Sequence, residues 1–67
     1  MRRQRTFLLA VRSEALAAER LLGITRADEA VRLAQRVLPE SIPTDTQKAA
    51  RNLVQLVFGQ RREVPAN

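Results

Sequence analysis

Residues that interrupt regular secondary structure divide this chain into three segments. Gly23 is the first interruption, Pro39 and Pro43 frame the second, and Gly59 ends the third segment. The residues between them are strong helix formers. We therefore predict an all-α fold, a small three-helix domain. Its helices are expected at about 4–22, 26–38 and 44–60.

The ends of these segments carry matching signals. Gly23 suits the left-handed position that follows a helix. Thr25 can cap the second helix, and Pro39 stops it. Thr44 is expected to cap the third helix, because the residues from Thr44 to Gln47 fit a capping box.

The first segment has a second interpretation. Apolar residues alternate between Phe7 and Val11 as in a β-strand, so a short N-terminal strand at residues 6–12 remains the alternative. Leu8 and Ala10 favour the helix, because a half-buried strand should carry polar residues there.

Size predicts that this chain has a partner. A chain of 67 residues buries only about 60% of its unfolded surface on folding. Disulfides, a metal ion or a partner chain usually compensate in such small domains. The sequence has no Cys and no His, so we expect no metal and no cofactor. A homodimer or a larger protein assembly is the remaining prediction.

Two apolar surfaces are candidates for that partner. At about 100° per residue, Leu9 and Leu16 fall almost opposite the apolar stripe of the first helix. In the third helix the apolar residues cover about 200°, more than one packing contact buries. We predict that the partner or dimer interface contains Leu9, Leu16, Leu56 and Phe58.

Positive charge is concentrated at the amino end. The net charge is +5, and residues 1–12 carry four arginines and no acid. Cations at the start of a helix oppose its dipole, so Arg2, Arg3 and Arg5 are expected to form an arm. This arm either binds nucleic-acid phosphates or only makes the protein more soluble. The predicted organisation is a basic arm at 1–5, a helical domain at 6–62 and a flexible tail at 63–67.

The third helix has a polar face without acids. It consists of Lys48, Arg51, Asn52, Gln55 and Arg62, of which the first four are the predicted DNA contacts. Arg, Asn and Gln read the edges of guanine and adenine, and the major groove of DNA admits a helix. This face is a candidate for DNA recognition; its alternative is an ordinary solvated surface.

Composition argues against several other classes of protein. The sequence has no His, Cys, Tyr or Trp, so we predict no enzyme activity and no small-molecule substrate. No apolar run approaches the roughly 18 residues of a membrane span. The apolar run near the amino end, about five residues, is shorter than secretory signals use. We expect a cytoplasmic, prokaryotic protein.

Residues 22–34, Leu-Gly-Ile-Thr-Arg-Ala-Asp-Glu-Ala-Val-Arg-Leu-Ala, resemble the junction into the second helix of ribbon-helix-helix antitoxins and repressors. In that family two chains pair N-terminal strands, and the resulting ribbon enters the major groove. The resemblance implies a ribbon at residues 6–12 and contacts to the DNA backbone from Thr25 and Arg26. The outward ribbon positions are polar in the family, whereas here they are mostly apolar.

The turn around Gly23 is also similar to that of factor-for-inversion-type helix-turn-helix proteins, although Glu29 stands where that pattern has an apolar residue. Both resemblances imply DNA binding. We therefore predict a small non-enzymatic DNA-binding regulator, repressor or antitoxin-like, that acts as a dimer. The alternative is a helical protein–protein interaction module, an adaptor or inhibitor, with no nucleic-acid role.

Overall fold

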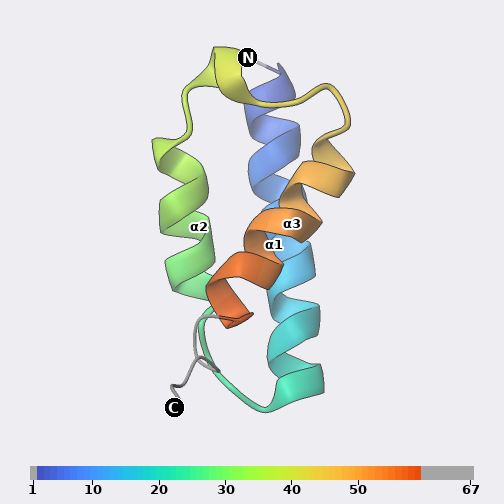
Figure 1. Cartoon of the computed structure of the whole chain (residues 1–67), viewed down its shortest axis with the longest axis vertical. Helices are drawn as coiled ribbons and strands as arrows, with labels where there is room; N and C mark the ends of the chain where they lie inside the picture. Colours follow the sequence, from blue (N-terminus) through green and yellow to red (C-terminus); the bar gives the residue numbers. More distant parts are fainter. Residues whose placement is uncertain (1, 60–67) are drawn as a thin grey trace, which may run out of the picture.

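A computed structural model describes residues 2–59 (Figure 1). Within this range the chain forms α1 (Arg2–Leu22), α2 (Ala27–Arg36), the 3-10 turn η1 (Pro39–Ser41) and α3 (Thr46–Gly59). No residue of this range is in a strand. The prediction of a small all-α domain with three helices is confirmed. The N-terminal strand considered for residues 6–12 is not formed, because all of them lie within α1.

The amino end differs from the prediction of an arm preceding the helical domain. Helix α1 begins at Arg2, so Arg2, Arg3 and Arg5 belong to its first turns. An exposed cation near a helix N-terminus costs only about 0.3–1 kcal/mol, and Arg otherwise favours helix. The Arg3 Nη1 atom also donates a hydrogen bond of 3.4 Å to the Ile42 carbonyl oxygen. The predicted tail at 63–67 lies outside the described residues.

The other helix ends are shifted by about two residues. Helix α2 stops at Arg36, and Val37 and Leu38 are extended, since a residue before proline disfavours the helical conformation. The cap of α3 is Asp45, not the predicted Thr44. The Asp45 Oδ1 atom accepts a hydrogen bond of 3.1 Å from the Lys48 backbone N–H, the third position of the helix.

Gly23 ends α1 as predicted. Its φ of +71° is left-handed, and its N–H donates a hydrogen bond of 2.8 Å to the Glu19 carbonyl oxygen, the pattern of a single-bond left-handed stop. The prediction that Thr25 caps α2 is wrong. The side chain that accepts a hydrogen bond from the first N–H of α2 belongs to Glu19 of α1. The Ala27 N–H donates a hydrogen bond of 2.8 Å to Glu19 Oε2.

Helix α1 is the central element of the domain. It packs against both α2 and α3, and those two touch each other less. In Figure 1, α2 runs antiparallel to α1 after the turn at Gly23, and α3 crosses in front of α1. The outer face of α1 therefore remains uncovered over its whole length.

Small residues dominate the buried core. It consists of Phe7, Ala10, Val11, Ala15, Ala27, Ala30, Ala34, Ile42, Ala50, Val54, Val57 and Phe58. Six of these twelve are alanines, which let the helices approach closely but bury little apolar area each. None of the nine leucines of the chain is fully buried. Six of them are exposed, and the other three, Leu8, Leu33 and Leu53, are partly buried against the core.

Candidate functional site

The outer face of α1 carries most of the surplus charge of the chain. This surface, called the arginine face below, consists of Arg2, Arg5, Leu9, Arg12, Leu16 and Arg20. All six residues are exposed. They share one side of the helix at 100° per residue, opposite the buried Phe7, Val11 and Ala15.

The two acidic residues of α1 are directed away from the arginine face. Glu14 Oε2 accepts a hydrogen bond of 3.1 Å from Gln47 Nε2 and lies 3.9 Å from Arg51 Nε, both on α3. Glu19 is engaged with the start of α2. No ion pair within residues 2–59 involves the four arginines of this face. Their charge is therefore available to an external anion.

The arginines flank a narrow apolar strip. Arg5 and Arg12 project along one edge, and Arg2 and Arg20 along the other, with the two leucines between them. Arg2 and Arg20 are 18 residues apart, about five turns or 27 Å along the axis. The face therefore presents cations at both edges of a long helix.

The seven predicted DNA contacts do not form one surface. Arg2 and Arg5 lie on the arginine face, whereas Arg3 is turned to the loop before α3. The other four, Lys48, Arg51, Asn52 and Gln55, are exposed on α3. Arg51 lies beside Glu14, so its charge is partly compensated.

Arg12 and Arg20 belong to this cationic surface, although they are not among the predicted nucleic-acid contacts. Their spacing from Arg2 and Arg5 is helical throughout, which is the signal that would have found them. The prediction of an arm at residues 1–5 placed Arg2 and Arg5 in a segment separate from the helix. Their common face with Arg12 and Arg20 was therefore not recognised.

Three of the four predicted interface residues are exposed. Leu9 is 62% exposed, Leu16 44% and Leu56 62%. Phe58, in contrast, is only 4% exposed and belongs to the core, although it also lines the groove described below. The sequence pattern of α3 does not show which edge of its wide apolar arc faces α1. In the structure the edge that contains Phe58 is buried, and the edge that contains Leu56 is exposed.

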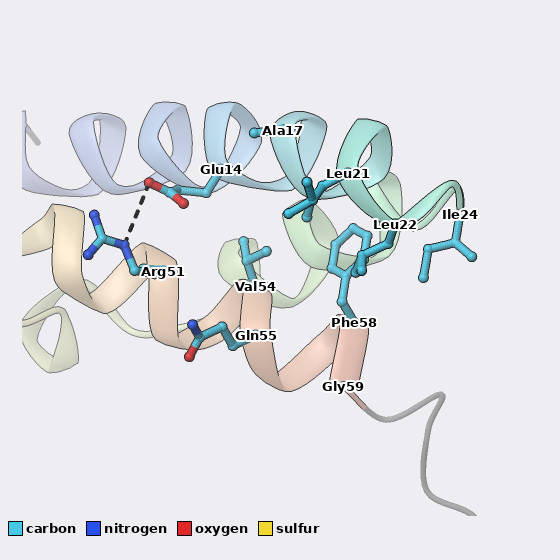
Figure 2. A pocket seen from close by; sticks show the side chains of 11 residues that line it. Glu14, Ala17, Leu21, Leu22, Ile24, Arg51, Val54, Gln55, Phe58 and Gly59 are labelled. Carbon is cyan, nitrogen blue, oxygen red and sulfur yellow. Dashed lines mark ion pairs between the residues drawn. The ribbon is translucent and has the colours of Figure 1, made fainter.

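A groove of about 600 Å³ lies between α1 and α3 (Figure 2). Its wall is mostly apolar, and its lining includes Leu21, Leu22, Val54 and Phe58. Figure 2 shows both leucines and the Phe58 ring at one end, and the ion pair between Glu14 and Arg51 at the other. Leu21 is 83% and Leu22 55% exposed. The sequence carries no spacing signal for this groove, because it forms where two helices pack.

The ribbon-helix-helix resemblance implies that Arg26 contacts the DNA backbone. In the structure, the Arg26 side chain is instead engaged within the protein. Arg26 Nη1 donates a hydrogen bond of 2.8 Å to the Val57 carbonyl oxygen, and Nη2 lies 3.0 Å from Glu29 Oε1. This guanidinium therefore holds two helix ends together.

Two further features bear on the kind of protein this is. No helix of the described part is long and apolar enough to cross a membrane. Residues 2–59 contain no group of three or more acidic side chains placed to hold a metal ion. Comparisons with protein-family models, curated proteins and solved structures find no match.

Proposed function

We propose that this is a small non-enzymatic DNA-binding protein that holds the phosphate backbone on the arginine face of α1. The observation that carries the proposal is the row of four exposed guanidinium groups on a face without acids. Guanidinium matches the geometry of phosphate oxygens and keeps its charge at all physiological pH values. Neutralising phosphates releases condensed counterions, which supplies affinity without sequence information.

The arrangement of the arginine face suits a helix lying in the major groove. The groove is about 12 Å wide and admits one α-helix. Arginines at the two edges of α1 would then reach phosphates of the two strands. Leu9 and Leu16 between them would face the floor of the groove, where thymine methyl groups offer apolar contacts. Because the arginines of this face would contact phosphates, most of its affinity should be independent of sequence, and the leucines would add only a weak preference for thymine.

Base reading would fall to the exposed polar face of α3, with Lys48, Asn52 and Gln55. Within the class of DNA-binding proteins, the role that we propose is a dimeric regulator, repressor or antitoxin-like, in the prokaryotic cytoplasm. Arg51 would contribute less than the arginine face, since Glu14 lies beside it.

Fluorescence anisotropy with a random duplex tests the proposal. Four phosphate contacts predict a slope of log K against log salt of about −3.6 per chain, which is about a 150-fold loss between 50 and 200 mM salt. The double variant Arg5→Ala with Arg12→Ala should halve this slope and weaken binding at least about tenfold at low salt.

The matched control is Arg32→Ala with Arg36→Ala, on the exposed side of α2. It removes the same net charge without touching the arginine face. A control that weakens binding as much as the test variant would contradict a specific role for α1. Absence of binding to any duplex at low salt would overturn the proposed function.

The exposed leucines favour a helical protein-interaction module as the second candidate. Leu9 and Leu16 form an apolar strip that is exposed to water and that a partner protein would cover. The arginines beside this strip would favour an acidic partner. Replacing both leucines by Ser distinguishes the two functions. A DNA-binding face should lose less than about threefold in affinity, whereas a protein-docking strip should lose most of its partner binding.

A further inference from the structure

The groove between α1 and α3 combines a projecting apolar group with a hollow. Leu21 is 83% exposed at the groove's edge, and Leu22 beside it is 55% exposed. The hollow between them and α3 has a volume of about 600 Å³ and reaches the Phe58 ring (Figure 2). A two-fold interface requires one patch that carries both the projection and the cavity that receives it.

Charge favours pairing of two copies at this groove over pairing at the arginine face. The charged side chains of the groove are Glu14 and Arg51, one of each sign, 3.9 Å apart. Two grooves can therefore approach each other without net repulsion. Two arginine faces would bring together four arginines on each side, which repel.

The composition of the core supplies an energetic reason for pairing. Half of the buried core residues are alanines, and six of the nine leucines are exposed. Burying the exposed side chains of Leu21 and Leu22 against a second copy would remove apolar surface from water and so stabilise the dimer.

We propose that a second copy of this chain occupies the groove, in a two-fold dimer in which Leu21 of each copy enters the groove of the other. This dimer forms without nucleic acid and leaves the arginine face of each copy exposed. It can therefore stand or fall independently of DNA binding.

Light scattering over a dilution series, without DNA, tests the proposed dimer. The wild-type chain should have the mass of two chains at high concentration and dissociate on dilution. Leu21→Glu would place an unpaired charge in the apolar interface and should raise the dissociation constant at least about 30-fold. Leu38→Glu is the matched control, since Leu38 is 59% exposed and lies outside the groove.

Amide spectra of the wild-type chain at several concentrations locate the interface without any variant. The concentration-dependent shifts should cluster at groove residues such as Ala17, Leu21 and Gln55. A monomer at all concentrations up to about 1 mM would overturn the proposal. So would a dimer whose shifts cluster around Leu9 and Leu16, or one that Leu38→Glu disrupts as strongly as Leu21→Glu.

Discussion

The Arg26 guanidinium joins the beginning of α2 to the end of α3 through a 2.8 Å hydrogen bond from Nη1 to the Val57 carbonyl oxygen. Val57 lies in the last turn of α3, where carbonyl groups lack partners within the helix. The start of α2 is completed in the same way, since its Ala27 N–H donates to the Glu19 carboxylate of α1. Two helix ends are thus capped by side chains that belong to other parts of the chain.

Arg26→Ala should lower the free energy of unfolding by about 1–2 kcal/mol, because the Val57 carbonyl loses a charged donor and Glu29 loses its ion pair. Chemical denaturation followed by circular dichroism measures this change. Arg32→Ala, at an exposed position of α2, should stay within about 0.5 kcal/mol of the wild type. Equal losses in the two variants would show that the contact of Arg26 with Val57 contributes nothing to stability.

The two glycines of the chain should respond to alanine with opposite signs. Gly23 has a φ of +71°, so Gly23→Ala should destabilise by about 1–2 kcal/mol through backbone strain, although no atom obstructs the added methyl group. Gly59 ends α3 without a left-handed φ and with open space around it. Gly59→Ala should therefore be neutral or stabilise by up to about 0.5–1 kcal/mol. Thermal unfolding of both variants compares the two signs, and a stabilised Gly23→Ala would contradict the assigned turn.

The cap of α3 can be tested with two neighbouring substitutions. Asp45→Ala should cost about 1 kcal/mol, because the Lys48 N–H loses its acceptor. Thr44→Ala should change stability by less than about 0.5 kcal/mol, since only the backbone carbonyl of Thr44 accepts a hydrogen bond, from the Thr46 N–H. Urea denaturation of both variants gives the comparison. A larger loss of stability for Thr44→Ala than for Asp45→Ala would show that Thr44 caps α3, as the sequence pattern predicts.

Phe58 and Leu56 are apolar residues of α3 with opposite burial, Phe58 in the core and Leu56 at the surface. Phe58→Ala should cost about 3–5 kcal/mol, which is comparable to the whole stability of a small domain, so most of the helical signal should be lost at room temperature. Leu56→Ala should stay within about 0.5 kcal/mol in dilute solution, because the side chain is already 62% exposed. Circular dichroism at low protein concentration distinguishes these results. A folded Phe58→Ala variant would mean that the ring contributes little to the core.

Local sequence signals were sufficient for the helices themselves. The stop at Gly23 depends only on the backbone of one residue, and the end of α2 depends on the proline that follows within three residues. The sequence also located the exposed Leu9 and Leu16, because the angular position of a side chain on a helix follows from its number alone.

The caps and surfaces that join distant residues required the tertiary structure. Glu19 caps α2 from another helix, and Arg26 reaches a carbonyl group 31 positions away. Neither contact has a spacing signal, because the distance between two helices depends on how they pack. The sequence by itself determined three helices and a surplus of positive charge near the amino end. Only the tertiary structure decided that Phe58 is buried, that Leu21 borders a groove, and that the side of α1 with the arginines stays exposed. The physical reason is that helix packing determines which side of each helix is removed from water.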